Sequence, residues 1–133
     1  MGYIKLNDSQ FHLNIPPDSG IYFIYSISEN GHPKAVQRVL KIDSSGILYI
    51  GKSKNIKDRL RMLFRVLHPE LYKADAHTFG KNYNQSLGLQ DSFPLESLAI
   101  NYHLTQDYSN LETSELKKYF DEFGEVPPLN FSR

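Results

Sequence analysis

Hydrophobic positions divide the chain into short runs with the periods of strands and helices. From Gly20 to Ile27 every residue after the glycine except Ser26 is apolar or aromatic, which is typical of a strand covered on both faces. Residues 36–42 and 47–50 form two further apolar runs separated by turn residues, so the pattern predicts a three-stranded antiparallel meander. A short edge strand is expected ahead of it, where apolar and polar residues alternate: Phe11, Leu13 and Ile15.

An amphipathic helix is predicted after the third strand. Asn55 can cap its first turn, and Pro69 ends it because proline disfavours helical geometry in the residue before it. Arg59 lies roughly 60° from Ile56 around this helix, at the flank of the apolar stripe, so its side chain can lean over the sheet. The stripe itself recurs at steps of three and four: Ile56, Leu60, Leu63, Phe64 and Leu67.

The second half of the chain contributes a further strand and helix. A clean alternation over residues 98–104 predicts a half-buried strand. The stretch 71–91 is weakly periodic and is compatible with a short helix. Ser109 and Glu112 have the spacing of a capping box, which predicts a helix that begins at Ser109 and ends at Gly124. Its expected apolar face comprises Leu116, Tyr119, Phe120 and Phe123.

Length and composition place the chain among ordinary globular proteins. Its 133 residues suit a single domain, spanning 1–133, and no apolar run is long enough to cross a membrane. Cysteine is absent, which excludes disulfides and thiolate metal sites. We therefore expect a soluble, cytoplasmic protein without membrane contacts.

Charge is balanced overall but unevenly distributed. The formal net charge is zero, which argues against binding nucleic acid through bulk charge alone. Residues 52–65 are nevertheless strongly basic, and residues 107–125 are acidic. Two solvated helix faces are the usual explanation of such runs. A functional interpretation requires the basic run to lie beside a reactive site.

Glu112 has two competing interpretations. Helical spacing puts it on the same face as Leu116, Tyr119 and Phe123, where a carboxylate must be hydrogen-bonded, paired or bound to a metal. The capping box with Ser109 would satisfy it locally without any function. The residues alone leave both interpretations open.

Five short motifs, in this order, resemble the landmarks of the GIY-YIG nuclease family. They are Gly20-Ile21-Tyr22, Tyr49-Ile50-Gly51-Lys52-Ser53, Arg59, Glu112 and Pro128-Leu129-Asn130. The resemblance covers the chain from Gly20 to Asn130. It implies an α+β fold, with a small three-stranded antiparallel sheet flanked by helices. It also implies hydrolysis of nucleic-acid phosphodiesters with one divalent metal ion.

The resemblance assigns expected catalytic roles to four residues. Glu112 matches the metal-binding carboxylate, and a single hard ligand suits Mg²⁺ or Mn²⁺. Tyr22 and Tyr49 match the motif tyrosines, of which one would act as general base and the other would position the attacking water. Arg59 matches the arginine that would hold the phosphate. Without the motif, the tyrosines are ordinary sheet aromatics and Arg59 is a surface side chain lying along its helix.

Four further residues are candidate substrate contacts. Lys52 and Lys54 belong to the basic run, and Asn130 matches a residue thought to brace the site. His77 lies between the arginine and the glutamate, where several relatives have a histidine. His68 is a weaker candidate, since a lone histidine in a loop is more often a surface residue. Asn130 can equally be read as the end of a strand.

The chain also departs from the family pattern. We interpret residues 28–45 as an insertion that forms an extra hairpin arm on a core of residues 20–130, with 1–19 as a lead-in. No second domain for sequence targeting is recognisable, so a protein partner is a candidate source of specificity. The leading hypothesis is a metal-dependent DNA endonuclease, for example in DNA repair, with RNA as an alternative substrate. The alternatives are a nucleic-acid-binding module or a protein-interaction module with an idle site.

Overall fold

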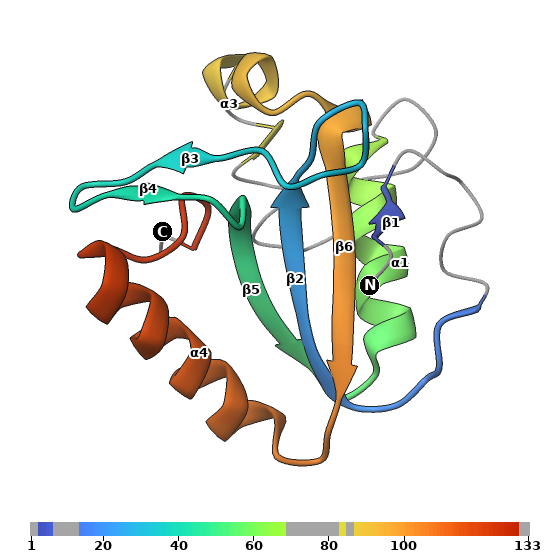
Figure 1. Cartoon of the computed structure of the whole chain (residues 1–133). Coiled ribbons are helices and arrows are strands. Elements are labelled where there is room, and N and C mark those ends of the chain that lie inside the picture. Colours follow the sequence, from blue (N-terminus) through green and yellow to red (C-terminus); the bar gives the residue numbers. More distant parts are fainter. Residues whose placement is uncertain (1–2, 7–13, 69–82, 85–86, 131–133) are drawn as a thin grey trace.

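The fold is α+β and is built on one antiparallel sheet (Figure 1). The computed structural model describes residues 3–6, 14–68, 83–84 and 87–130. The sheet has the strand order β1-β6-β2-β5. Its strands are β1 (Ile4–Lys5), β2 (Gly20–Ser26), β5 (Ile47–Ser53) and β6 (Leu98–Leu104). The α+β class is confirmed, but the prediction of a three-stranded sheet is wrong, because β1 pairs with β6 and adds a fourth strand.

The predicted meander is also wrong. Residues 36–42 do not join the main sheet; instead β3 (Val36–Gln37) and β4 (Ile42–Asp43) form a separate two-stranded sheet. The reason is that β2 is already paired with β5 on one side and with β6 on the other. The segment therefore forms the hairpin arm expected of the 28–45 insertion (Figure 1). The expected edge strand around Leu13 lies outside the described residues, apart from its end at Ile15.

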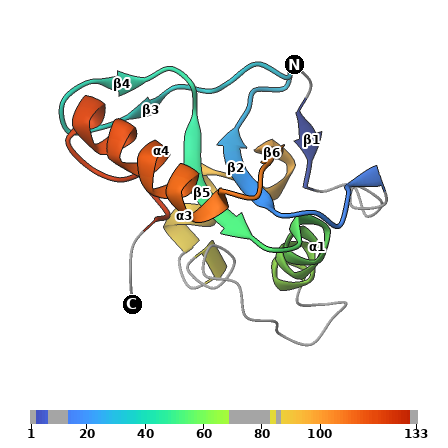
Figure 2. The same cartoon turned by 90° about the horizontal axis from the view of Figure 1, so that it is seen from below.

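Helix α1 (Ile56–Leu67) has the predicted bounds. The Asn55 side chain caps it by accepting a hydrogen bond from the amide of Asp58 at 3.1 Å. Its apolar stripe is buried with Tyr22 and Ile24 of β2 in one core cluster. Helix α4 (Tyr108–Phe123) packs on the opposite side of the sheet, mainly against β5 (Figure 2). A short helix, α3 (Leu87–Ser92), and a 3₁₀ helix over Leu95–Ser97 precede β6.

Helix α4 differs from its prediction at two points. It begins at Tyr108 with Asp107 as N-cap, not at Ser109, which puts Glu112 in the second turn and beyond reach of the expected capping box. Phe120 was expected on the apolar face, but it is 53 % exposed, because Tyr119 and Phe123 fill the space against the sheet. Gly124 ends the helix as predicted, in the left-handed conformation with φ of 78°.

The two faces of β2 are covered unequally. Tyr22 and Ile24 are fully buried on the α1 side. Phe23 and Tyr25, which alternate with them, point to the other face and are partly exposed. The predicted cover on both faces is thus complete on the α1 side and partial on the second face, where Ile21 is buried and α4 lies mainly over β5.

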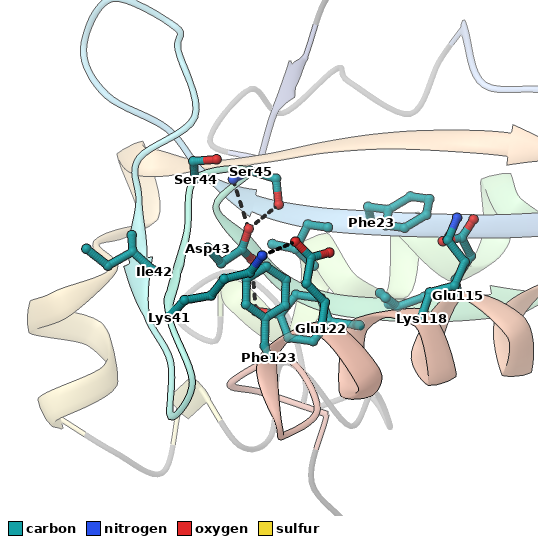
Figure 3. A pocket seen from close by; sticks show the side chains of 13 residues that line it. Phe23, Lys41, Ile42, Asp43, Ser44, Ser45, Glu115, Lys118, Glu122 and Phe123 are labelled. Atoms are coloured by element: carbon teal, nitrogen blue, oxygen red, sulfur yellow. Dashed lines mark hydrogen bonds and ion pairs between the residues drawn. The ribbon is translucent and has the colours of Figure 1, made fainter.

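The hairpin arm is fastened to the C-terminal half of α4 (Figure 3). Asp43 is 1 % exposed, and its carboxylate accepts hydrogen bonds from the Ser45 amide and from the Tyr119 hydroxyl at 2.9 and 2.8 Å. Arg38 forms an ion pair with Glu125 at 2.8 Å. Between the arm, β5 and α4 lies a pocket of about 310 Å³. The arm thus holds α4 in place over the sheet.

Candidate active site

Strand register places Tyr22 against the second motif, Tyr49-Ile50-Gly51. Tyr22 pairs with Gly51 of β5, and its ring crosses directly over that glycine. A Cβ atom at position 51 would lie 2.4 Å from Tyr22 Cζ and 2.6 Å from the hydroxyl oxygen. Glycine is therefore required at position 51 for a tyrosine to be buried at position 22. The hydroxyl end of Tyr22 is thereby fixed at the end of β5.

Tyr49 lies beside Tyr22 on the same face of the sheet. The two ring centroids are 6.1 Å apart, and the two hydroxyls are hydrogen-bonded to one another. Tyr49 is 8 % exposed, whereas Tyr22 is completely buried. Of the two motif tyrosines, Tyr49 is therefore the one nearer to solvent.

Arg59 reaches both tyrosines from the second turn of α1. Its side chain hydrogen-bonds with Tyr22 and with Tyr49, and its charge acts on both hydroxyls. The position follows from the sequence: Ile56 and Leu60 are buried in the core and hold the helix, and Arg59 lies on the flank between them. We call Tyr22, Tyr49 and Arg59 the tyrosine–arginine cluster.

Glu112 belongs to a second group, on the other face of the sheet. The Lys52 ammonium lies 3.8 Å from Glu112 Oε1 and donates a hydrogen bond of 3.3 Å to Ser109 Oγ. The Glu112 side chain is 20 % exposed and that of Lys52 is 44 % exposed. We call these three residues the lysine–glutamate cluster (Lys52, Ser109 and Glu112). Ser109 was predicted as a helix cap, and no sequence pattern indicated its contact with Lys52.

The two clusters flank the end of strand β5. Tyr49 and Gly51 point to the α1 face, whereas Lys52, paired with Ile21, points to the α4 face. Because β5 is the edge strand of the sheet, its end gives access to both faces. Glu112 is close enough to Tyr49 for its charge to raise the pKa of the tyrosine. The structure thus brings all four predicted catalytic residues to one end of the sheet.

Burial dominates the acidity of these groups. It raises the pKa of Tyr22 far above its ordinary value of 10.0, and Tyr49 adds to this while Arg59 opposes it. Burial also raises the pKa of Tyr49, and Arg59 and the hydrogen bond from Tyr22 oppose the increase. The pKa of the Glu112 carboxyl is raised by burial and lowered by Lys52, with a net increase. Both tyrosines are therefore neutral at pH 7 in this state.

Asn130 braces the edge strand. Its side-chain amide accepts a hydrogen bond of 2.8 Å from the Ile50 amide and donates one of 2.9 Å to the Ile50 carbonyl. Leu129 adds a backbone hydrogen bond to Leu48. Asn130 therefore holds β5 between Tyr49 and Gly51, which agrees with the bracing role of the residue that it matches. Its side chain is partly exposed, and its expected substrate contact stays a prediction.

The remaining candidates are dispersed. Lys54 is exposed in the turn between β5 and α1, on the same end of the sheet as Lys52. His68 ends α1 and its Nδ1 lies 2.8 Å from the Phe64 carbonyl oxygen, so it belongs to the helix terminus. His77 lies outside the described residues.

A divalent metal ion fits one position among these residues. Glu112 is partly exposed and its charge acts on Tyr49. Mg²⁺ commonly binds through one carboxylate, with water and substrate phosphate as its other ligands. Within the described ranges no three His, Asp or Glu side chains cluster as a metal site. Any metal held here would therefore take most of its ligands from water and substrate.

Comparison with models of known families, with curated proteins and with solved structures finds no match to this chain. Across the described part of the chain, no helix has the length and apolar character of a membrane span. Functional assignment therefore rests on the residues and their arrangement.

Proposed function

We propose that this protein is a metal-dependent endonuclease of the GIY-YIG type that hydrolyses phosphodiester bonds in DNA. The observation that carries the proposal is the arrangement around the end of edge strand β5, with Tyr49 and Arg59 on one face and Glu112 and Lys52 on the other. A hydroxyl, a guanidinium and a carboxylate around one strand end are the groups that phosphoryl transfer needs.

The chain's own residues would bind and orient the phosphate. Lys52 is exposed and Arg59 approaches from the opposite face, so a phosphodiester at the end of β5 lies between two cations. Arg59 donates paired hydrogen bonds of the kind that suit phosphate oxygens. Positive charge there stabilises the additional negative charge that develops on the phosphate in the transition state. When bound at Glu112, Mg²⁺ or Mn²⁺ would polarise the scissile phosphate and stabilise the leaving oxygen.

Tyr49 is better suited than Tyr22 to meet the attacking water. In hydrolysis a water oxygen forms a bond to phosphorus, its proton passes to a base, and the bond to the leaving oxygen breaks. Tyr22 is completely buried beneath Gly51, whereas Tyr49 retains some exposure and accepts a hydrogen bond from Tyr22. That hydrogen bond and Arg59 both favour the phenolate of Tyr49, the form that can take a proton.

One observation favours a second candidate, a DNA-binding module with an idle site. Burial raises the pKa of both motif tyrosines, which disfavours the phenolate that would act as general base at pH 7. Such a protein would bind DNA and would not cleave it.

The test is a cleavage assay on labelled plasmid, single-stranded, flapped and branched DNA and on RNA, with Mg²⁺ or Mn²⁺. We expect metal-dependent strand breaks that the Glu112→Ala protein does not produce. The Glu122→Ala protein is the matched control, since Glu122 is a carboxylate on the same helix, paired with Lys41 at the surface. Equal cleavage by the wild type and the Glu112→Ala variant would reject the proposal, and binding without cleavage would favour the idle module.

A further inference from the structure

Three aromatic rings form a row on the sheet face opposite α1. The rings of Phe23 and Tyr25, both on β2, have centroids 6.1 Å apart and planes inclined by 30°. Tyr3 closes the row edge-on to Tyr25, at 4.9 Å and 69°. All three side chains are partly exposed. We call this row the aromatic platform (Phe23, Tyr25 and Tyr3).

A hollow runs along the platform where α4 leaves the sheet uncovered. It has a volume of about 300 Å³, and its lining includes Phe23, Tyr25, Asn101 and Glu115. This volume is at the lower end of the range for small-molecule sites. In Figures 1 and 2, none of the described helices covers β6 on this side of the sheet. The rings therefore border a space that a planar group can enter.

The platform is continuous with the candidate active site. Ile21, Phe23 and Tyr25 alternate along β2 and share one face, and Lys52 is the register partner of Ile21. Tyr25 is thus four residues along β2 from the position of Lys52, about 13 Å at the usual strand rise. Leu111 and Glu115, which flank Glu112 on α4, line the hollow. A chain lying on the platform therefore ends beside Lys52 and Glu112.

We propose that the aromatic platform stacks the unpaired bases of a single-stranded DNA segment whose backbone leads to Lys52. This inference rests on the proposed endonuclease function and specifies its substrate as DNA with a single-stranded segment next to the cut. Two rings 6.1 Å apart on one strand are arranged for successive bases, because every base has a face that stacks on an aromatic ring.

The composition of the hollow favours nucleic acid over a protein segment. Asn101, His103 and Glu115 give it polar groups that can hydrogen-bond base edges. Asn101 also hydrogen-bonds with Tyr25, and Glu115 forms an ion pair with Lys118 at 3.6 Å, so the hollow has a polar border that suits base edges better than an apolar peptide. Stacking adds binding free energy beyond the charge contacts, which suits a chain of zero net charge whose basic residues include Lys52.

The experiment measures fluorescence anisotropy of a labelled 12-nucleotide oligo-dT and of a blunt duplex of the same length, in EDTA. We expect the single strand to bind at least about tenfold more tightly than the duplex. Phe23→Leu and Tyr25→Leu should each weaken single-strand binding about fivefold or more, the loss expected for one stacked base. Tyr25→Phe, which keeps the ring, should bind like the wild type.

Phe120→Leu is the matched control, because Phe120 is an exposed aromatic outside the hollow, and its binding should be unchanged. Circular dichroism establishes that each variant is folded. In the wild type, photo-crosslinking of an oligonucleotide that contains 4-thiothymidine should label the peptide carrying Phe23 and Tyr25.

Equal affinity for single strand and duplex, unchanged binding in both leucine variants, or capture of a protein by the platform with no DNA binding would overturn the inference. The assay contains no metal ion, so it is independent of cleavage. Platform-dependent binding with no cleavage on flapped DNA would reject the endonuclease and keep the binding site.

Discussion

Ionisation of Glu112 lowers the stability of the folded state. Burial raises its pKa above the ordinary 4.5, and the nearby Lys52 reduces this effect without abolishing it. A carboxyl with a raised pKa stabilises the folded protein only while it is protonated. The stabilisation is complete below about pH 4.5 and is lost as the pH rises through the raised pKa. A residue that costs stability at neutral pH is typical of a functional site.

We therefore predict that Glu112→Gln has a higher melting temperature than the wild type at pH 7. The difference should shrink as the pH falls towards 4, where the wild-type carboxyl is itself neutral. Thermal melts of both proteins between pH 4 and pH 8 measure this, with Glu122→Gln as control. A Glu112→Gln protein that is less stable than the wild type at pH 7 would show that the carboxylate is a structural ion-pair partner of Lys52.

Gly51 is predicted to be intolerant of even one methyl group. In Gly51→Ala the new Cβ would lie 2.4 Å from Tyr22 Cζ, so the buried ring must move. We expect a loss of about 1–3 kcal/mol in the free energy of unfolding, typical of overpacking. Urea denaturation measures it, and Gly31→Ala is a useful contrast, because nothing lies within 4 Å of its added Cβ and only its positive φ is strained. Equal losses in the two variants would show that contact with Tyr22 is not the cause.

At the scale of elements, edge strand β5 depends on the C-terminal segment. The Asn130 side chain hydrogen-bonds with both the backbone amide and the backbone carbonyl of Ile50. It does so on the side of β5 that faces away from β2. Since Tyr49 and Gly51 flank Ile50, the same contact fixes the second motif. An edge strand without such a partner exposes its backbone and frays.

Asn130→Ala should lower the free energy of unfolding by about 2–3 kcal/mol, because two backbone groups of a buried residue lose their partners. Faster hydrogen exchange at the Ile50 amide should accompany the loss. Asn110→Ala is the matched control, since Asn110 bonds only to the exposed Asp107 side chain. Normal protection of the Ile50 amide in the Asn130 variant would contradict the bracing role.

The elements that the sequence predicted well are those whose signals are local. Helix α1 follows from the Asn55 cap, its apolar stripe and Pro69, and strand β6 follows from its alternation. The predictions were wrong where contacts with distant segments determine the structure. Residues 36–42 look like a sheet strand, and only the pairing of β2 with β5 and β6 excludes them. Likewise, the capping box failed because the helix begins at Tyr108.

The candidate site shows the same division. The motifs singled out Tyr22, Tyr49, Arg59 and Glu112. The first three form one cluster, whereas Glu112 lies with Lys52 on the other face of the sheet. The sequence could not show that the Tyr22 ring packs against Gly51 or that Ser109 contacts Lys52. Such facts depend on side-chain packing between distant segments.

At the scale of the whole molecule, positive and negative charges balance but are unevenly distributed. The net charge is zero, and cations near the hairpin arm and the second half of α4 are paired with acids, as in Lys41 with Glu122 and Lys117 with Asp121. Lys54 is exposed in the turn that follows β5. The protein should therefore contact few phosphates of the DNA, all of them close to the candidate active site.

We predict a shallow salt dependence for single-stranded DNA. With three or four phosphate contacts, the slope of log K against log salt should be about −2 to −3. Lys54→Ala should make the slope less negative by about 0.7, whereas Lys117→Ala should leave it unchanged. Binding titrations between 50 and 200 mM salt, roughly the range over which such losses become large, measure both. An identical slope in the Lys54 and Lys117 variants would contradict local binding.

The most direct test of the account is single-turnover cleavage of a flapped DNA duplex with Mg²⁺, by the wild type and by Glu112→Gln. The account predicts cutting next to the single-stranded segment and a rate at least about 100-fold lower in the variant, the scale of removing one group that stabilises the transition state. Glu122→Gln should cut at the wild-type rate. Cleavage by Glu112→Gln at the wild-type rate, or no cleavage by a wild-type protein that binds the same flap, would contradict it.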